Sequence, residues 1–351
     1  MTEFRECQLR DIVCFGNGKA RPKAEGNIPV YGGNGILEYA DQFNYDGETI
    51  IIGRVGAYCG SVFYENRPIW ISDNALAAKP KGSNSTKYLY YLLKLSDLNQ
   101  HAEGSSHPLI TQTLLNSVEV MYCEDVIIQK AIAEVLSSLD DKIDLLTRQN
   151  NTLEDLGQAY FRRWFDDEKN VGRLGDYIQL FDNKRIPLSA MEREKKKDGK
   201  LYPYYGAATI MDYINDYIFD GEYILLGEDG TVETADGYPV LQYATGKFWC
   251  NNHAHILQAK PPYTNYSLWF CLRQCTISHI VSGAVQPKIN QQNLNSLEIP
   301  VPPQNVFDKI NEISGNIFSK ILANSEQIYT LQKLRDTLLP KLISGEVRVK
   351  I

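Results

Sequence analysis

Several short stretches of the chain contain residue types that could do chemistry. GNGKA (16–20) is similar to a phosphate-binding loop, which requires GxxxxGK followed by Ser or Thr to hold magnesium. Here Lys19 is followed by Ala20, and the matching stretch later in the chain, FDNKR, has neither glycine. A nucleotide-binding loop is therefore not predicted.

The tripeptide PPY (261–263) resembles the core of the motif with which enzymes methylate adenine N6. That motif needs Asn, Asp or Ser before the prolines, to accept a hydrogen bond from the amino group being methylated. Lys260 stands there instead, and an ammonium group has no acceptor. No convincing S-adenosylmethionine loop precedes it, so we expect that the chain is not itself a methyltransferase.

Cysteine and histidine side chains in the second half could be arranged as a zinc site. They are Cys250, His253, His255, Cys271 and Cys275. In the internal repeat described below, their counterparts are Ile71, Asn74, Leu76, Leu92 and Ser96. The shared architecture therefore does not require a metal, and none is predicted. His107 has no evident activated Ser or Cys partner, so a hydrolase is not predicted either.

The elements that must position any site come from an internal repeat. LRDIVCFGNGKARP (9–22) aligns with LGDYIQLFDNKRIP (174–187), and DGETIIIGRVG with DGEYILLGEDG. Further on, GSSHPLITQTLLNSVEV (104–120) aligns with GAVQPKINQQNLNSLEI (283–299). Two copies this long indicate two similar domains, because a solenoid needs shorter and more numerous repeats.

Each copy mixes strands and helices. The runs ETIIIG and EYILLG, bounded by turn residues, predict strands. KYLYYLLKL (87–95) and YSLWFCLRQC (266–275) predict one short helix per copy. We therefore expect α+β domains.

A long amphipathic helix follows each copy. Its apolar positions after the first copy include Ile128, Ile132, Val135, Leu139, Ile143, Leu146, Leu153 and Tyr160. After the second copy they include Ile310, Ile313, Ile317, Ile321, Ile328, Leu331 and Leu338. Neither stripe fits inside its own small domain, so the sequence predicts that the helices pack on each other as an antiparallel coiled coil. This would relate the domains by a pseudo-twofold axis. Asn150 and Asn324 fall on the stripes, where a buried polar residue usually fixes the register.

The expected organisation is a first domain at 1–122, a central helix at 123–165, a second domain at 166–299 and a C-terminal helix at 300–351. No apolar run approaches the ~18 residues of a membrane span. The start, MTEFRECQLRD, has no signal segment, and the seven cysteines include no CxxC pair. We expect a cytoplasmic bacterial or archaeal protein with no membrane contact. The net charge of −7 is adverse to DNA binding by the bare chain.

The ordered set of motifs closely resembles one family over essentially the whole chain. The motifs are IPVYGGNG, IIIGRVG, QPKINQQNLNSLEIPVPP and LRDTLLPKLISGEV, on two domains alternating with two long helices. The family is the specificity subunit of type I restriction-modification systems.

The resemblance implies that each domain is a target-recognition domain for one half of an asymmetric, interrupted DNA sequence. It implies partners as well: double-stranded DNA, two copies of the modification (methyltransferase) subunit docked on the helices, and a restriction (translocase and endonuclease) subunit. S-adenosylmethionine would belong to the modification subunit, and ATP and magnesium to the restriction subunit. The specificity subunit itself would bind no cofactor and perform no chemistry.

Polar and cationic residues on loops that differ between the copies are the predicted DNA contacts, because such side chains pair with base edges and phosphates. In the first domain they are Lys19, Arg21, Lys23, Asn34, Arg54, Tyr58, Ser106 and His107. In the second they are Lys184, Arg185, Lys195, Lys196, Lys197, Thr209, Glu228, Asp229, Gln286 and Lys288. For Lys195, Lys196 and Lys197 the alternatives are phosphate contact and a merely solvated charge run.

The stretch IPVYGGNG (28–35) corresponds to YPYYGAAT (202–209) in the second copy. A phosphate cradle would not survive the loss of two glycines, whereas a turn with a variable tip would. We therefore interpret the stretch as a turn on a shared scaffold. Two other classes of protein stay open: a structural coiled-coil adaptor with two protein-binding domains, and an enzyme with an unrecognised site.

Overall fold

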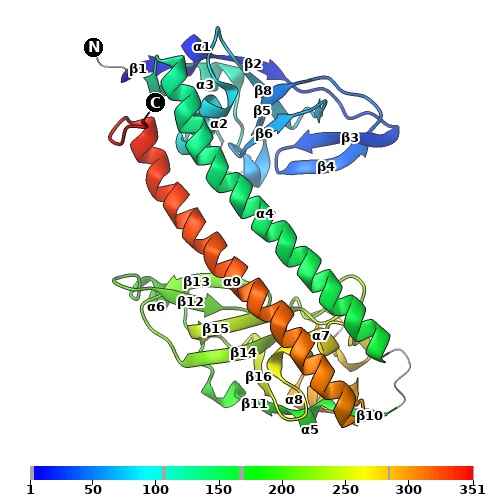
Figure 1. The fold of residues 1–351 in the computed structure, drawn as a ribbon. Helices are drawn as coiled ribbons and strands as arrows, with labels where there is room; N and C mark the ends of the chain where they lie inside the picture. Colours follow the sequence, from blue (N-terminus) through cyan, green and yellow to red (C-terminus); the bar gives the residue numbers. More distant parts are fainter. Residues whose placement is uncertain (1–3, 105–107, 166–169, 284, 351) are drawn as a thin grey trace. The chain divides into compact units, whose positions relative to one another are not determined.

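The computed structural model describes residues 4–104, 108–165, 170–283 and 285–350. The chain divides into two compact units, unit 1 (Met1–Leu146 and Glu326–Ile351) and unit 2 (Thr147–Ser325). Each unit holds one copy of the repeat and part of each long helix, α4 (Val126–Phe165) and α9 (Gln304–Ile343) (Figure 1). Among the described residues, no helix is long and apolar enough to cross a membrane.

Unit 1 contains three small sheets, with orders β1-β9, β2-β8-β5-β6 and β4-β3-β7. The strands are β1 (Phe4–Gln8), β2 (Val13–Asn17), β3 (Glu25–Gly32), β4 (Gly35–Ala40), β5 (Glu48–Gly53), β6 (Val62–Asn66), β7 (Trp70–Ile71), β8 (Ala75–Pro80) and β9 (Glu119–Cys123). The helices are α1 (Leu9–Ile12), α2 (Thr86–Leu95) and α3 (Gln112–Ser117), with 3-10 turns η1 (Gly56–Tyr58) and η2 (Leu98–His101). The β3–β4 hairpin stands out from the rest of the unit (Figure 1).

The position of β5 between two cores explains why its sequence is a continuous apolar run. Ile50 and Ile52 point into the main core of unit 1, which also contains α2. Ile51 points to the opposite face and packs with Tyr31 and Ile71. Successive side chains of a strand alternate between faces, so a strand covered on both faces must be apolar throughout.

Unit 2 repeats this plan with one larger sheet, of order β11-β16-β14-β15-β12-β13, and the pair β10-β17. The strands are β10 (Val171–Arg173), β11 (Ile178–Leu180), β12 (Tyr202–Tyr205), β13 (Ile210–Ile214), β14 (Phe219–Gly227), β15 (Leu241–Cys250), β16 (Ala254–Ala259) and β17 (Glu298–Pro300). The helices are α5 (Leu174–Tyr177), α6 (Ala190–Glu194), α7 (Asn265–Leu272) and α8 (Gln291–Ser296), with 3-10 turns η3 (Asp182–Lys184) and η4 (Ser278–Ile280).

One long strand accounts for the larger sheet. β15 pairs with β14 and, through Trp249, in parallel with Tyr204 of β12. In unit 1 the same parallel pair, Val30 with Trp70, is made by the short β7, which is separate from β6. The equivalent strands of the two units therefore pair in the same way, but in unit 2 they form one continuous sheet and in unit 1 they form separate sheets.

Equivalent backbone hydrogen bonds confirm the repeat. The amide of Leu9 donates to Val118 at 2.9 Å, and that of Leu174 donates to Leu297 at 2.8 Å. The pairs Ser72–Tyr31 and Asn251–Tyr205 match in the same way, at 2.9 and 3.1 Å. The predicted helices near 87–95 and 266–275 are α2 and α7, and the two predicted strands are β5 and β14. The predicted α+β class is therefore confirmed.

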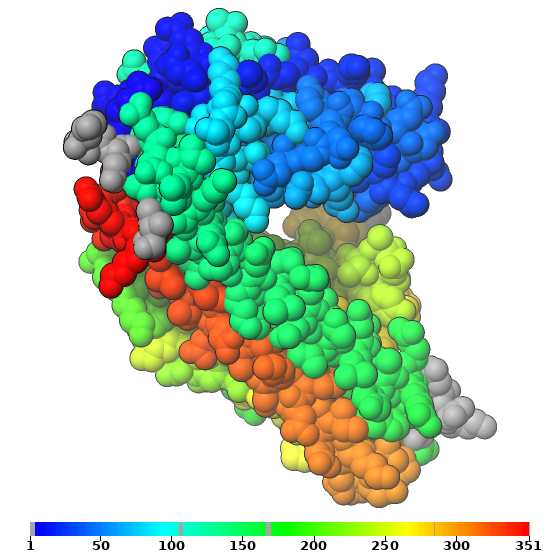
Figure 2. Space-filling view, turned by 45° about the horizontal axis from the view of Figure 1, so that its top comes forward, coloured from blue at the N-terminus to red at the C-terminus, as the bar shows by residue number. Residues whose placement is uncertain are grey.

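The long helices pack together, but the expected burial of their stripes was partly wrong. In both units the segments of α4 and α9 run antiparallel (Figure 1), and Figure 2 shows α9 lying along α4. However, the ends of both helices also belong to the domain cores: Ile132 and Leu136 of α4 and Leu342 of α9 in unit 1, and Phe161 of α4 and Phe307 of α9 in unit 2.

Because the domain cores also pack on the helix ends, the buried face there is not the predicted one. Val135 and Tyr160, expected on the apolar stripe, are 38% and 39% exposed, while their neighbours Leu136 and Phe161 are fully buried. The apolar spacing predicts the buried face only where the partner helix alone covers each stripe. At the helix ends the domain core selects the buried face instead.

Candidate nucleic-acid interface

Three loops meet in unit 1: the turn between β3 and β4, the loop that follows β5, and the segment that leads into α3. The amide of Arg54 donates to the carbonyl of Asn74 at 3.0 Å. The carbonyl of Arg54 accepts from the amide of Ile110 at 2.9 Å, and the amide of Gly56 donates to Pro108 at 3.1 Å. These bonds fix the backbone of the loop that contains Arg54.

Gly53 allows the β3–β4 turn to rest on this loop. A Cβ atom at Gly53 would lie 2.5 Å from the carbonyl oxygens of both Gly33 and Tyr58, which is closer than atoms can approach. The turn Gly33–Asn34 therefore lies beside the loop from Arg54 to Tyr58. The interpretation of IPVYGGNG as a turn is confirmed. Asn34 is exposed, and Tyr58 is 55% exposed.

Arg54 has an unusual environment among these residues. Its side chain is half-buried, and its Nε is enclosed and has no hydrogen-bond partner. Within the described part of the chain, no carboxylate lies within ion-pair distance of its guanidinium group. The loop thus holds a positive charge that no described carboxylate neutralises.

The equivalent loop of unit 2 has the same backbone and different side chains. Glu228 occupies the position of Arg54: its amide donates to His253 at 2.8 Å, and its carbonyl accepts from Ile289 at 2.8 Å. The amide of Gly230 donates to Pro287 at 3.0 Å. Each of these three bonds has its counterpart in unit 1.

Glu228 belongs to a buried charged network. Arg185 Nη1 donates to Glu228 Oε2 at 2.5 Å and to the carbonyl of Ala254 at 2.7 Å. Asp182 lies 3.6 Å from Arg185 Nη2, and Lys288 Nζ lies 3.4 Å from Glu228 Oε1. The Arg185 and Glu228 side chains are only 11% and 13% exposed. The ion pair therefore occupies both groups within the protein.

His255 and Asp182 complete this network. Nδ1 of His255 faces Asp182 Oδ2 at 2.6 Å, and Nε2 faces the carbonyl of Ile289 at 2.8 Å. Both ring nitrogens therefore have a hydrogen-bonding partner within the protein. Burial alone would raise the pKa of Asp182, but hydrogen bonds from His255, the Ile256 amide and Gln291 hold it below its usual value.

The same network bears on metal binding. Among the described residues, Asp182, Glu228 and His255 form the one group of ligating side chains whose atoms all lie within 4.8 Å of one another. The guanidinium of Arg185 already supplies a cation to both carboxylates. None of the cysteines considered as zinc ligands joins this group, and His253 is bound to Asp229. The donor set therefore fits an ion-pair network better than a metal site.

Comparison with known proteins assigns the family. The model of the type I restriction modification DNA specificity domain matches residues 1–155 and again 166–333. The chain belongs to this family.

Relatives and solved structures agree with this assignment. The type I restriction enzyme MjaIX specificity subunit of Methanocaldococcus jannaschii is 26% identical over 332 residues, which cover 83% of this chain and 76% of the relative. A putative type I restriction enzyme specificity subunit of Haemophilus influenzae, S.HindORF215P, is 33% identical over 140 residues, which cover 40% and 35%. The crystal structure of the S subunit from the type I restriction-modification system of M. genitalium has a TM-score of 0.66 at 18% identity, covering 99% of this chain and 96% of that one. At that identity it shows the fold alone.

Within this specificity-domain scaffold, some predicted contacts of unit 2 lie at the loop that contains Glu228 and at the segments beside it, and others do not. Asp229 pairs through its backbone with Lys288, which also pairs with Ser282. Gln286, in the same segment, is exposed, and so is Thr209 after the β12 strand. Lys184 instead lies over the Phe181 ring, with its Nζ 5.2 Å from the centroid.

Two of the three lysines in the run beside α6 are paired with aspartates. Nζ of Lys196 lies 2.8 Å from Asp216 and 5.6 Å from the centre of the Trp249 ring. Lys197 pairs with Asp212, and that hydrogen bond holds the pKa of Asp212 below its usual value. Lys195 is exposed. Two of the three charges are thus balanced within unit 2.

In unit 1 the remaining predicted cations lie on the segment after β2. Lys19 is exposed, and its backbone pairs with Ser72. Arg21 lies 3.7 Å from Glu38 of β4, and Lys23 is exposed. Ser106 and His107 lie outside the described residues. Whether any of these residues contacts DNA stays a prediction.

The sequence analysis missed the residues that support the loops. Gln291 Nε2 donates to Asp182 at 2.7 Å, and Gln112 Nε2 donates to Asn17 at 2.9 Å at the same place in unit 1. The available signal was the glutamine that both copies share, four residues after the aligned prolines Pro108 and Pro287.

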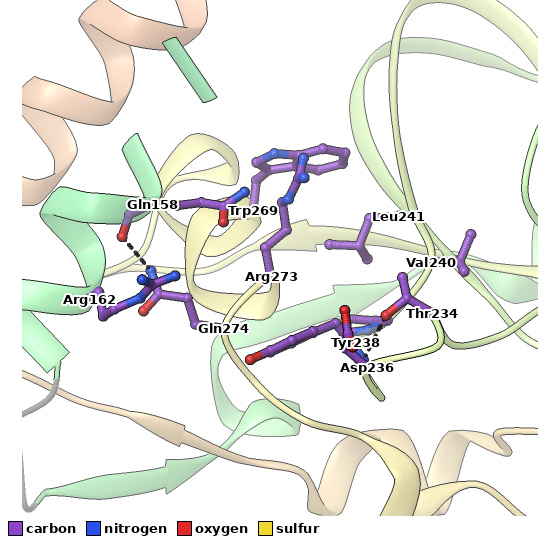
Figure 3. A pocket seen from close by; sticks show the side chains of 11 residues that line it. Gln158, Arg162, Thr234, Asp236, Tyr238, Val240, Leu241, Trp269, Arg273 and Gln274 are labelled. Atoms are coloured by element: carbon purple, nitrogen blue, oxygen red, sulfur yellow. Dashed lines mark hydrogen bonds between the residues drawn. The ribbon is translucent and has the colours of Figure 1, made fainter. Parts of the chain in front are cut away.

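Unit 2 also contains a cleft of about 630 Å³, shown in Figure 3. Gln158 and Arg162 of α4 line one side, and Trp269, Arg273 and residues 234–241 line the rest. Gln274 Nε2 donates to the carbonyl of Gln158 at 3.1 Å. None of the predicted DNA contacts that the structure describes lines this cleft.

Tyr263 of the PPY tripeptide belongs to the core of unit 2, whereas Pro261 is exposed. Tyr263 is 3% exposed, and its hydroxyl donates to the carbonyl of Pro300. A tyrosine enclosed in this way serves packing, which agrees with the expectation that the tripeptide is not a methylation motif.

Proposed function

We propose that this chain is the DNA sequence-specificity subunit of a type I restriction-modification complex and has no catalytic activity of its own. Each domain would recognise one half of an asymmetric, interrupted target. The helices α4 and α9 would dock two copies of the modification subunit. A restriction subunit would complete the assembly that cleaves DNA.

One observation supports the division into two half-sites. The two domains hold equivalent loops with the same backbone hydrogen bonds and present different side chains on them. Arg54 corresponds to Glu228, Val55 to Asp229, and Leu109 to Lys288. A shared scaffold with different contact groups suits two different base sequences better than one palindrome.

The acidic net charge of −7 is compatible with this assignment if partner subunits supply much of the phosphate contact. S-adenosylmethionine would bind to the modification subunits, and ATP and magnesium to the restriction subunit. This chain would position them on DNA.

Co-expression with the modification subunit tests the proposal. We expect adenine methylation at one bipartite motif, mapped by long-read sequencing of the host DNA. Methylation at a continuous palindrome, or an active complex without any motif, would contradict the proposal.

A chimera separates the roles of the two domains. Residues 166–299 are exchanged for the corresponding domain of another specificity subunit. Only one half of the motif should then change. A change in both halves would show that the domains do not act separately.

A further inference from the structure

The loop position occupied by Arg54 in unit 1 and Glu228 in unit 2 has one backbone and opposite charges. Both residues accept a backbone hydrogen bond from the equivalent isoleucine, Ile110 or Ile289. Both donate one to the equivalent carbonyl, that of Asn74 or His253. The backbone thus fixes where each side chain starts, and the neighbours decide what it can contact.

In unit 2 the neighbours neutralise the charge. Arg185 lies 2.5 Å from Glu228, and His255 lies 3.6 Å from the same carboxylate. Buried charges are tolerated when they are paired and hydrogen-bonded in this way. Arg185 and Glu228 are therefore already engaged with each other within unit 2.

In unit 1 none of these partners is present. Ala20 replaces Arg185, Leu76 replaces His255, and Asn17 replaces Asp182. A carboxylate for Arg54 is therefore lacking at every equivalent position. In the part of the chain that the structure describes, its enclosed Nε has no acceptor. The enclosed Nε belongs to the part of the side chain that lies within the loop, and no described carboxylate engages the rest of the guanidinium group, so its Nη donors are left for an acceptor that comes from outside.

We propose that Arg54 recognises a guanine in the half-site of unit 1, by donating from its planar fork to O6 and N7. This inference rests on the proposed function. Bidentate pairing with guanine needs an arginine whose orientation is fixed, and the half-buried stem of Arg54 provides that. A phosphate contact needs only a mobile cation at the rim, and the exposed Lys19 and Lys23 already suit that role. Asn34 and Tyr58, on the adjoining turn and loop, would border the same base.

The proposal makes the two half-sites chemically different. Unit 1 would recognise guanine through the residue after Gly53. Unit 2, whose equivalent residue is neutralised internally, would recognise its half through other groups of its loops. The difference between the two half-sites then has two sources. Unit 1 has Arg54 where unit 2 has Glu228, and it has Ala20 where unit 2 has the neutralising Arg185.

Variants of the full chain, in complex with its modification subunits, test the inference. Arg54→Gln removes the charge, and Arg54→Lys keeps the charge but removes the fork. Arg10→Gln, on the exposed surface of unit 1, is the matched control. Binding is measured on duplexes in which each position of the wild-type motif carries each of the four bases.

We expect both Arg54 variants to lose about 10- to 100-fold of the preference for guanine at one position, in one half only. The control should keep the full preference. Uniform weakening across all bases, with a shallower salt dependence, would mark a phosphate contact and overturn the inference. An unchanged base preference in both variants would overturn it as well.

The wild-type complex distinguishes a failure of the proposed function from a failure of the Arg54 inference. If it shows no bipartite motif, the proposed function fails, and the inference fails with it. If its motif is intact and only the Arg54 prediction fails, the proposed function stands. Should Arg54→Gln not fold, judged by circular dichroism, Arg54→Lys decides alone.

Discussion

Asn324 of α9 and Asn150 of α4 are joined by a hydrogen bond of 2.9 Å, in which Nδ2 of Asn324 donates to Oδ1 of Asn150. Asn150 in turn donates to the hydroxyl of Ser325 at 3.2 Å. Asn324 is fully buried, and its Oδ1 has no hydrogen-bond partner among the described residues. The hydrogen bond between the two asparagines can form only when the two helices hold one relative position, so it selects the register.

The effects of removing the two halves of this pair should not be additive. We expect Asn324→Leu to lower the free energy of unfolding by about 1–3 kcal/mol, because Asn150 is left with unsatisfied groups. The double variant Asn150→Leu/Asn324→Leu should be destabilised by less than the sum of the two single variants. A double-mutant cycle in chemical denaturation measures this coupling. Strict additivity would contradict the proposed role.

A second polar anchor joins the helices in unit 1. Asp140 of α4 accepts from Arg335 of α9 at 2.7 Å and from the Tyr91 hydroxyl of α2 at 2.8 Å. We expect Asp140→Ala to destabilise unit 1 by about 1–3 kcal/mol, because it leaves the buried Tyr91 hydroxyl unpaired and leaves Arg335 with Asp336 as its remaining partner. The neighbouring Asp141→Ala should stay within about 0.5 kcal/mol, since Asp141 is exposed. Equal effects of the two variants in thermal unfolding would refute the anchor.

The close approach at Gly53 yields a third prediction. Gly53→Ala places a methyl group 2.5 Å from two carbonyl oxygens, those of Gly33 and Tyr58, so the loop and the turn must move apart. We expect a loss of about 1–3 kcal/mol in the stability of unit 1, as for other overpacked sites. Gly33→Ala is the control, because its nearest contacts would be 3.4 and 3.5 Å. Urea denaturation compares the two, and a neutral Gly53→Ala would contradict the geometry.

The same loops show how far the sequence alone can lead. Aligning the two copies was enough to predict two similar domains, and helical periodicity was enough to predict α4 and α9, because both signals are local. The pairing of Arg185 with Glu228 was not predictable, since it depends on two residues 43 positions apart meeting in space.

Long-range packing also explains the other differences. Val135 and Tyr160 fit the apolar spacing, yet the domain cores bury Leu136 and Phe161 instead. Lys196 and Lys197 form part of a charge run in the sequence, yet Asp216 and Asp212 of the β13 region balance them. For loop residues the sequence therefore indicates which side chains are available, and the fold decides which of them stay free.

The buried network of unit 2 predicts how stability depends on pH. The pKa of Asp182 is lower in the folded chain than in the unfolded one, so the unfolded state binds the proton more readily. The stabilising contribution of Asp182 is therefore fully present above about pH 4, near the pKa of an unperturbed aspartate, and is lost as the pH falls through the lower folded value.

We therefore expect unit 2 of the wild type to lose stability on acidification below about pH 4 more steeply than Asp182→Asn, whose side chain does not titrate. The variant should be less stable than the wild type at neutral pH, because His255 loses its carboxylate partner. Asp220→Asn, at an exposed carboxylate of β14, is the control and should follow the wild-type profile. Fluorescence follows this unit, since Trp164, Trp249 and Trp269, three of the four tryptophans, lie in it. Parallel pH profiles for the wild type and Asp182→Asn would show that Asp182 does not couple folding to protonation.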